Sequence, residues 1–346
     1  MRTLISILAC ALALSAVPAA AQTTLFTDAA PLQLTLEAPL ARIVARAPTS
    51  LEPWPATLTL AGAAPLPVRV NPRGVSRRVG GFCTFPPLAI AFETGYVRGS
   101  PFDGQQKLKL VSYCRPGAIY EQYLVREYTA YRLYNLLTPM SLRVRPAQMT
   151  YHDTEGRRGD RTSFAFLIES IDDLARRNGR VELETEVNTV ATTQLDPAAS
   201  TRYALFQYMI GNLDWDFTSG KTGERCCHNN KLLARADAAT DLVSVPYDFD
   251  YSGFVDTPYS VPPSTIPVYD VRTRYYRGPC RFRAEIPAAV ALFQSRRADM
   301  LALIAAEPRL TDASKQSLTA YLGTFFATLD DPARTQRELT GRCGGT

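Results

Sequence analysis

The chain is poor in histidine, and this scarcity argues against several kinds of chemistry. Only two histidines occur among 346 residues, His152 and His228, so a Ser–His–Asp or Cys–His arrangement would have to use one of them as its base. No G-x-S-x-G segment, which marks the nucleophile of many hydrolases, is present. A zinc site is also disfavoured, because Cys226 and Cys227 are adjacent and lack the C-x-x-C spacing.

Long apolar runs are equally scarce. The run at residues 4–17 follows Arg2 and precedes three alanines at residues 19–21, which is the pattern of a secretory signal ending at residue 21. The run is too short for a stable membrane span, and no later stretch approaches one. We therefore expect a bacterial protein that is secreted or periplasmic after cleavage of this signal, without a transmembrane segment.

Neither sign of charge is in large excess. The formal net charge of +5 becomes +4 once Arg2 leaves with the signal. An arginine-rich stretch at residues 272–283 is interpreted either as a patch for an acidic substrate or lipopolysaccharide phosphates, or as a solvated loop. Because no nucleic-acid-binding motif accompanies it, nucleic acid is not expected among the partners.

Seven cysteines are present, and Cys10 belongs to the predicted signal. An even number of cysteines remains in an exported protein, which favours disulfides. A Cys83–Cys114 bond is the preferred local pairing. The adjacent Cys226 and Cys227 are expected to bridge to two different places, near Cys280 and in the carboxyl-terminal tail at Cys343.

Three polar segments in the second half of the chain carry the strongest chemical signal: residues 211–216, 227–233 and 243–250. They place Asp214 in a loop, Asn230 just before an apolar strand, and Asp248 just after the next apolar strand. Hard oxygen donors suit Mg²⁺, and one further carboxylate can receive or orient a hydroxyl. This order supplies one base and two metal ligands for phosphoryl transfer. A glycosidase is disfavoured, because Asp214 and Asp216 are too close in sequence to flank a sugar.

A lysine and a glutamate upstream are predicted to form an ion pair. Lys107 and Lys109 share one face of the strand expected at residues 107–113. Glu127 lies in the aromatic and aliphatic stripe of the helix expected at residues 120–137, where a carboxylate needs a cationic partner. We assign the pair to Lys109 and Glu127. Lys107 and Glu121 remain substitutes, and pairing of Glu127 with Arg126 or Arg132 on its own helix is the structural alternative.

The chain resembles the spore-coat CotH kinase family over roughly residues 68–253. The resemblance is carried by residues 73–77, 107–111, 127–128, 166–169, 211–214 (Gly-Asn-Leu-Asp) and 246–250 (Pro-Tyr-Asp-Phe-Asp). The last two motifs are the specific ones. The resemblance implies a secreted or surface-associated enzyme that uses ATP to phosphorylate a hydroxyl, usually on a protein.

The resemblance also assigns roles to individual residues. It implies that Asp214 is the catalytic aspartate, that Asn230 and Asp248 bind Mg²⁺ or Mn²⁺, and that Asp250 is a second carboxylate near the metal. In the same scheme Lys109, held by Glu127, orients the phosphates of the bound ATP. No G-x-G-x-x-G loop precedes these residues, so the phosphates are expected to be held differently from those in ordinary kinases.

Two further positions complete the predicted nucleotide site. Arg73 precedes a glycine between two strand-like runs, where a guanidinium and backbone N–H groups can bind phosphate. A solvent-exposed basic hairpin is the structural alternative. Glu169 ends an apolar run at the expected hinge, where contact with adenine would be made mostly by backbone. Lys107 is included as a second candidate cation for the nucleotide.

The predicted fold class is α+β, a two-lobed protein-kinase-like fold with a β-rich amino-terminal lobe and a mainly helical carboxy-terminal lobe. We divide the chain into the signal (1–21), an appended β segment (22–65), the first lobe (66–170) and the second lobe (171–346). Helices are predicted at residues 286–306 and 314–329 of the second lobe. The alternative function is that of a catalytically inactive secreted protein of this fold, with a binding or structural role.

Overall fold

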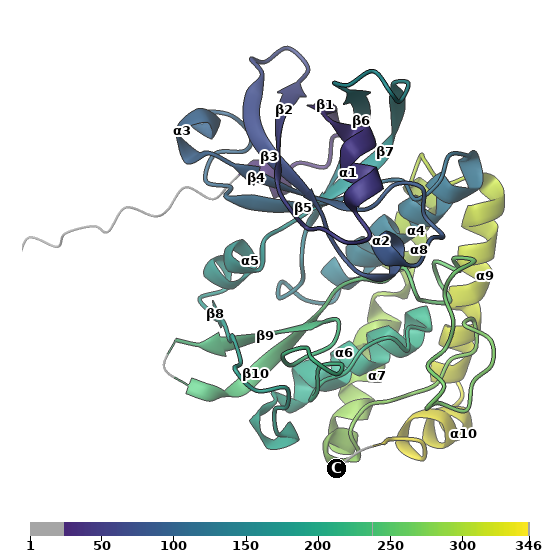
Figure 1. Cartoon of the computed structure of the whole chain (residues 1–346). Helices are drawn as coiled ribbons and strands as arrows, with labels where there is room; N and C mark the ends of the chain where they lie inside the picture. Colours follow the sequence, from purple (N-terminus) through teal and green to yellow (C-terminus); the bar gives the residue numbers. More distant parts are fainter. Residues whose placement is uncertain (1–23, 237, 345–346) are drawn as a thin grey trace, which may run out of the picture.

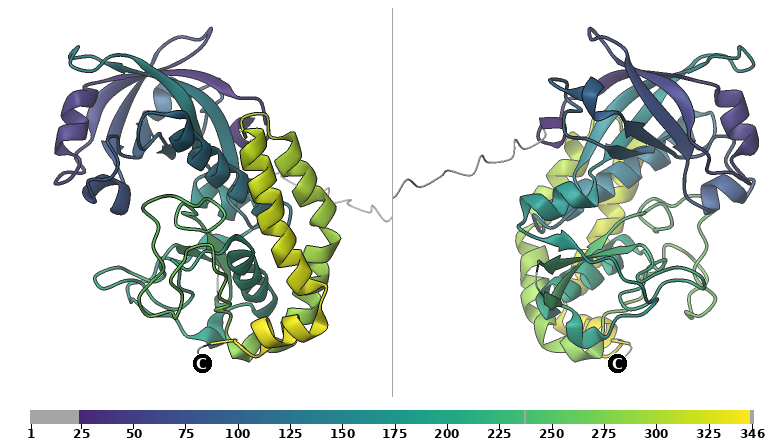
Figure 2. Two further views of the ribbon diagram at one scale, coloured as in Figure 1. Left: turned by 90° about the vertical axis from the view of Figure 1, so that its right-hand side faces the viewer. Right: turned by 60° about the vertical axis from the view of Figure 1, so that its left-hand side comes forward.

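The computed structural model describes residues 24–236 and 238–344 (Figure 1). The predicted signal at residues 1–21 lies outside the described residues. Within the described ranges no helix is long and apolar enough to cross a membrane. Both views in Figure 2 place a β-barrel at one end of the molecule, while the chain after the barrel, with the small sheet, extends to the other end.

Seven strands in the first half of the chain form a closed barrel in the order β1-β2-β3-β4-β5-β7-β6. Their bounds are β1 (Leu32–Ala38), β2 (Trp54–Leu60), β3 (Leu66–Pro72), β4 (Leu88–Phe92), β5 (Lys107–Val111), β6 (Val144–Asp153) and β7 (Arg161–Ile168). Neighbouring strands are antiparallel except β1 and β6, which pair in parallel from Leu32 opposite Ala147 to Ala38 opposite Asp153. This parallel pair closes the barrel.

The predicted two-lobed protein-kinase-like fold is therefore wrong. That α+β class has an open sheet in its amino-terminal lobe, whereas here β1 and β6 pair and leave the sheet closed. Residues 22–65 were predicted as an appended β segment, but β1 and β2 belong to the barrel itself. Alternation explains the placement of β1, whose Leu32, Leu34 and Leu36 are buried in the barrel core while the residues between them are more exposed.

Helices and a small sheet form the rest of the molecule. The helices near the barrel are α1 (Leu40–Arg46), α2 (Ser76–Val79), α3 (Thr94–Val97), α4 (Ala118–Asn135) and α5 (Ile171–Arg177). The remaining helices are α6 (Pro197–Ile210), α7 (Ile286–Ser295), α8 (Arg297–Ala306), α9 (Asp312–Leu329) and α10 (Pro332–Thr335). Strands β8 (Val181–Glu182), β9 (Asn230–Arg235) and β10 (Ala238–Pro246) form a sheet in the order β10-β9-β8.

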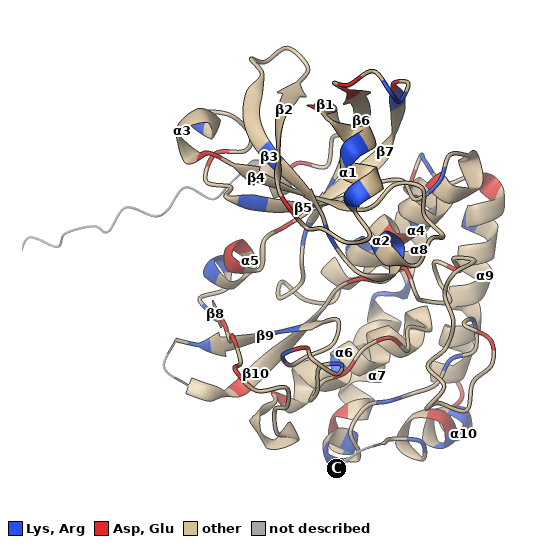
Figure 3. Cartoon of the chain, in the orientation of Figure 1, with Lys and Arg blue, Asp and Glu red and all other residues tan. Residues whose placement is uncertain are grey.

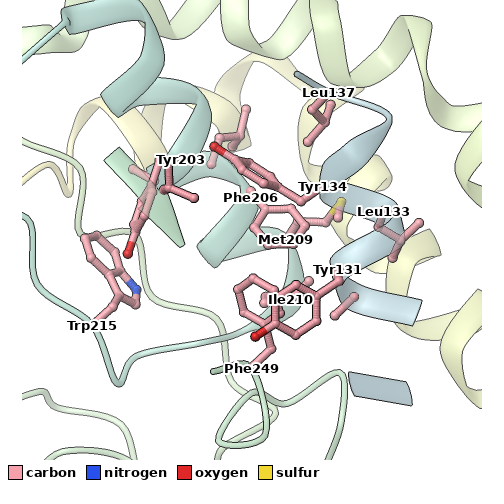
Figure 4. Close-up of a cluster of buried hydrophobic side chains, with 14 of the residues drawn as sticks. Tyr131, Leu133, Tyr134, Leu137, Tyr203, Phe206, Met209, Ile210, Trp215 and Phe249 are labelled. Carbon is pink, nitrogen blue, oxygen red and sulfur yellow. The ribbon is translucent and has the colours of Figure 1, made fainter. Parts of the chain in front are cut away.

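A large aromatic core joins α4 to α6 and to the segment after β10 (Figure 4). The ring of Phe249 lies 4.5 Å from that of Tyr131 on α4 and 5.5 Å from that of Phe206 on α6, measured between centroids. Phe249 is fully buried. Since Asp248 and Asp250 flank this ring, its burial fixes the backbone on which both carboxylates are carried.

Three disulfides connect the six cysteines in the described part of the chain. Cys83 bonds to Cys114, as predicted, with Cα atoms 4.6 Å apart. The predicted distant bridges of Cys226 and Cys227 are wrong, because these neighbours bond to each other and Cys280 bonds to Cys343. Disulfides of this kind are consistent with an extracellular protein.

Candidate functional site

Two loops meet at the place where β9 begins and β10 ends. Asn230 starts β9 and lies opposite Pro246 at the end of β10, and the Tyr247 N–H donates to the Asn229 carbonyl. The Gly253 N–H donates to the Gly211 carbonyl at 3.1 Å, which joins the loop after β10 to the loop after α6. These bonds bring the segments of Asp214, Asn230 and Asp248 together.

Gly211 is required by this junction for two reasons. It ends α6 with a φ of 64°, in the left-handed region that glycine adopts without cost. A Cβ atom placed there would lie 2.2 Å from the hydroxyl oxygen of Tyr321 on α9. A side chain at this position would push apart the loop that carries Asp214 and the helix behind it.

The side chain of Asn230 is buried, and only one of its two polar atoms has a hydrogen-bond partner among the described residues. Its side chain is 1 % exposed, and its Nδ2 donates to the Ser244 hydroxyl at 3.3 Å. Its Oδ1 is buried without a hydrogen-bond partner among the described residues. A buried oxygen without a partner is costly, so this atom fits the ligand role predicted for Asn230.

Asp248 has a left-handed backbone conformation, and its carboxylate has no hydrogen-bond or ion-pair partner in the described part of the chain. Its φ is 64°, and its N–H donates to the Tyr131 hydroxyl at 3.0 Å. Within the described ranges, no hydrogen bond or ion pair to its half-buried carboxylate is found. The backbone of Asp248 is held in place by a hydrogen bond, and its carboxylate has no partner among the described residues. Both properties suit a residue that binds a cation.

Asp250 is more deeply buried than Asp248. It is 4 % exposed, and its Oδ2 accepts a hydrogen bond from the Tyr259 hydroxyl at 2.9 Å. Burial, and then the neighbouring Asp248 carboxylate, raise the pKa of Asp250 to about 7. The Asp250 carboxylate is thus close enough to Asp248 for their charges to interact, but it is already engaged by a tyrosine.

Asp214 is held by three side chains from the segment that separates it from Asn230. Its Oδ1 lies 2.9 Å from both Lys221 Nζ and His228 Nε2, and its Oδ2 accepts from Asn229 Nδ2 at 3.1 Å. Burial alone would raise the pKa of Asp214, but the hydrogen bonds from His228 and Lys221 outweigh it and lower the pKa to about 2. The carboxylate therefore stays ionised at neutral pH in a fixed orientation.

Lys109 projects from β5 toward these groups. Its ammonium lies 4.6 Å from the centroid of the Tyr247 ring, next to Asp248 in sequence. Burial, and then the charge of Arg73, lower the pKa of Lys109 to about 8, although Asp248 acts in the opposite direction. Among the described residues it has no ion pair within 4 Å, so its charge is available to an anionic ligand.

Glu127 pairs with an arginine instead of the predicted lysine. It is 2 % exposed on α4, and its Oε2 lies 3.6 Å from Arg77 Nη1. Arg77 is itself fixed by a 2.8 Å bond from Nη2 to the Ser112 carbonyl. The predicted Lys109–Glu127 ion pair is not formed among the described residues. Lys107 is exposed at the start of β5, and Glu121 accepts from the Phe164 N–H at 3.4 Å.

The two remaining predicted nucleotide contacts lie in different surroundings. Arg73 follows β3 and is half-buried, and its Nε donates to the Leu88 carbonyl. Its positive charge lowers the pKa of Lys109 and the pKa of Glu127. Glu169 is saturated, because its oxygens accept from Arg177 at 2.8 and 3.0 Å and from the Arg143 N–H at 2.9 Å. Its side chain fixes the turn after β7, and any adenine contact there would fall to backbone groups.

Glu127 provides a test of the electrostatics of the site. Burial, and then Asp250, raise its pKa from 4.5 to about 8 despite Arg77. Between pH 4.5 and about pH 8 the folded protein keeps a proton on Glu127 that the unfolded chain has lost. The free energy of unfolding therefore falls as pH rises through this range, by up to about 1.4 kcal/mol per pH unit. We expect Glu127→Gln to reduce this slope in thermal melts recorded without nucleotide or divalent metal, while the part contributed by Asp250, whose pKa is also raised, remains.

The control for this experiment is Glu93→Gln, which changes an exposed glutamate. It should leave the pH dependence of the parent protein intact. An unaltered slope in Glu127→Gln would show that Glu127 is charged in the folded state across the whole range.

Several residues of the site were not predicted. Arg77 was part of the basic turn but was not assigned as the partner of Glu127, and Lys221, His228 and Tyr259 received no role at the site. Lys221 and His228 belong to the segment between Asp214 and Asn230, and their charge complementarity to Asp214 was the available signal. Tyr259 lies in a proline-rich stretch whose path sequence periodicity does not define.

Three arginines of the arginine-rich stretch make hydrogen bonds or ion pairs within the protein. Arg272 pairs with Asp256, Arg274 donates to the Met209 and Tyr321 carbonyls, and Arg277 donates to backbone carbonyls of the loop carrying Asp214. These contacts brace the loop after α6 from behind. Figure 3 shows basic and acidic positions interspersed over the chain.

The residues present could hold a divalent metal only in part. No group of three or more His, Cys, Asp or Glu side chains suited to a metal is found in residues 24–236 and 238–344. Asn230 and Asp248 offer an amide oxygen and a carboxylate. Mg²⁺ commonly takes one or two protein ligands and completes its shell with waters and phosphate oxygens, so these two residues fit a metal that arrives with a nucleotide.

Neither a protein-family model nor a curated protein sequence matches this chain.

Proposed function

We propose that this protein is a secreted phosphotransferase that moves the γ-phosphate of ATP to a hydroxyl acceptor with the help of Mg²⁺ or Mn²⁺. The observation that carries the proposal is a set of groups at one junction that have no direct hydrogen-bond or ion-pair partner among the described residues: the buried Asn230 Oδ1, the Asp248 carboxylate and the Lys109 ammonium. Buried polar groups are normally satisfied by the protein itself. Two oxygen donors and a cation left open together suit a metal–phosphate ligand.

Each side chain has a defined part in this proposal. Asn230 and Asp248 would hold the metal, and the bound metal would supply neutralisation of the charge on the phosphates. Lys109 and Arg73 would face the phosphate oxygens, and Glu127 would stay beside Arg77. Asp214, ionised and fixed by His228, would accept the hydrogen bond of the acceptor hydroxyl and orient its oxygen.

The segment between Asp214 and Asn230 also shapes the surroundings of the site. A cavity of about 180 Å³ lies beside Asn230, between Cys226 and Arg225 of this segment and Glu182 and Lys231 of the small sheet. We place part of the nucleotide or acceptor in this space. The acceptor class that we favour is a protein hydroxyl, in keeping with the resemblance to the CotH kinase family, and a bacterial periplasmic or secreted location follows from the predicted signal.

A protein that binds without catalysis is the second candidate. Two contacts favour it. Glu127 lies beside Arg77 and therefore does not orient Lys109, and the Tyr259 hydroxyl donates a hydrogen bond to the Asp250 carboxylate. Such a protein would bind metal and nucleotide, or another anion, without moving a phosphate. Measurements of binding and of transfer on the same sample separate the two candidates.

Thermal melting of the oxidised mature protein tests the proposal first. A ligand that binds only the folded state stabilises it by about 2.7 kcal/mol at a concentration one hundred times its Kd. We expect ATP with Mg²⁺ or Mn²⁺ to raise the melting midpoint by several degrees, and ATP with a chelator to raise it far less. A midpoint that is unchanged with both metals would contradict the proposed nucleotide site.

A transfer assay with γ-labelled ATP then distinguishes the candidates. Label on the protein itself or on an added protein acceptor supports the phosphotransferase. Metal-dependent binding without label on any acceptor supports the non-catalytic protein instead.

A further inference from the structure

A separate cavity lies where the amino-terminal segment and α4 meet the loop before β6. Its volume is about 420 Å³, which is within the range of about 300–1,000 Å³ found for small-molecule pockets. Its polar lining includes Asp28, Asn135, Thr138 and the arginines Arg132, Arg143 and Arg177. Figure 2 shows the purple amino-terminal segment where the barrel meets the helices. We call this space the arginine cavity.

A second cavity continues from the first. It has a volume of about 370 Å³ and shares Ala29, Tyr128 and Arg132 with the arginine cavity, so the two meet at these residues. It adds Arg309 and Glu307 to the lining. Neither cavity is lined by Asp214, Asn230 or Asp248, so the pair is distinct from the candidate phosphotransfer site.

The charges that line the two cavities do not cancel. Arg177 is paired with Glu169, and Asp28 is paired with Arg145. Arg132 and Arg309 share one carboxylate, Glu307, whose side chain is fully buried. Since one carboxylate balances one guanidinium, these two arginines together keep one positive charge in excess.

Arg143 contributes a further positive charge. Its side chain is half-buried, and its guanidinium has no ion pair or hydrogen bond among the described residues. The donors of Arg143 are therefore available to an anion in the cavity, and a guanidinium can bind phosphate oxygens through forked hydrogen bonds.

We propose that the arginine cavity binds a small organic phosphate, the class of phosphate monoesters. Two uncompensated positive charges match a dianion, and guanidinium groups bind phosphate oxygens through forked hydrogen bonds. The volume leaves room for an organic part beyond the phosphate. Asn135 and Thr138 on the wall provide polar groups for hydroxyls of that part.

Titration calorimetry with glycerol phosphate and with inorganic phosphate, at fixed ionic strength, tests this proposal. We expect the full mature chain to bind glycerol phosphate more tightly than inorganic phosphate. Arg143→Gln should weaken binding at least about tenfold, as expected for the loss of a hydrogen-bonded charge. Arg98→Gln, which changes an exposed arginine elsewhere, should bind like the parent.

Two further variants locate the ligand. Val144 also lines the cavity, and Val144→Phe should fill part of it and weaken binding while all arginines remain. Lys109→Ala should leave binding intact, because Lys109 belongs to the other site. Absence of binding to the parent protein, preference for inorganic phosphate, or loss of binding in Lys109→Ala but not in Arg143→Gln would each overturn the proposal.

Discussion

Replacement of Asp248 by asparagine is expected to abolish metal-dependent nucleotide binding while the fold is kept. Changes to residues that merely orient metal ligands cost about 10- to 100-fold in metal affinity, so loss of a carboxylate ligand should cost more than about 100-fold. Asparagine tolerates the φ of 64° at this position, and the N–H that donates to Tyr131 is unchanged. Calorimetry with ATP and Mg²⁺ measures the effect.

A matched control is present in β10. Asp241 has a φ of 53° and is exposed, so Asp241→Asn makes the same chemical change in a similar backbone conformation away from the site. It should bind ATP as the parent does. Parent-like binding by Asp248→Asn would remove Asp248 from the metal site and, with it, the main support for the proposed function.

Local patterns in the sequence predicted elements better than they predicted how the elements join. The expected helices at residues 120–137 and 314–329 correspond to α4 and α9. The single helix expected at residues 286–306 is two helices, α7 and α8, which meet at Arg296. Apolar periodicity continues through Arg296, so composition alone does not mark the break.

Closure of the barrel is a property that no local pattern predicts. The strands β1 and β6 are separated by more than one hundred residues, yet they pair along their length. Proline and alanine around β1 and β2 suggested an appendage, and the short alternation of β1 was too weak to place it in a sheet. Such non-local pairing depends on tertiary packing more than on propensity.

The order of polar residues was more informative for the site than individual pairings were. Asp214, Asn230 and Asp248 were expected to lie together because their types and their order along the chain supply one base and two metal ligands. The hydrogen bonds between their segments show that these segments are neighbours. The partner of Glu127 could not be predicted in the same way. Arg77 lies on the four-residue helix α2, which is too short to show periodicity.

The segment between Asp214 and Asn230 illustrates a second limit. It contains glycine, lysine and cysteine residues, and this composition does not predict an ordered structure. In the structure, Asp216 Oδ1 accepts hydrogen bonds from the Thr218 and Ser219 N–H groups at 2.8 Å, and Lys221 and His228 turn back to Asp214. The segment is ordered by hydrogen bonds to the carboxylates of Asp214 and Asp216 from residues that follow them, a pattern that composition conceals.

Asp214→Asn is expected to separate phosphate transfer from nucleotide binding. A positioned carboxylate that orients or accepts the proton of a hydroxyl contributes about 10²- to 10⁴-fold to a rate, so transfer should fall by this factor. ATP and metal affinity should stay close to those of the parent, because the proposed metal ligands are Asn230 and Asp248. Single-turnover transfer and calorimetry on one preparation measure the two quantities.

The pH dependence of the Asp214 carboxylate sharpens this expectation. Its pKa is lowered from 3.8 to about 2 in the folded protein, so its ionisation favours the folded state above pH 3.8 and that contribution is lost as pH falls through about 2. Asp214 is thus ionised throughout the range in which the protein is assayed, and loss of transfer above pH 5 must come from other groups. If Asp214→Asn transfers phosphate at the parental rate, or loses nucleotide binding as completely as Asp248→Asn does, Asp214 does not orient the acceptor hydroxyl.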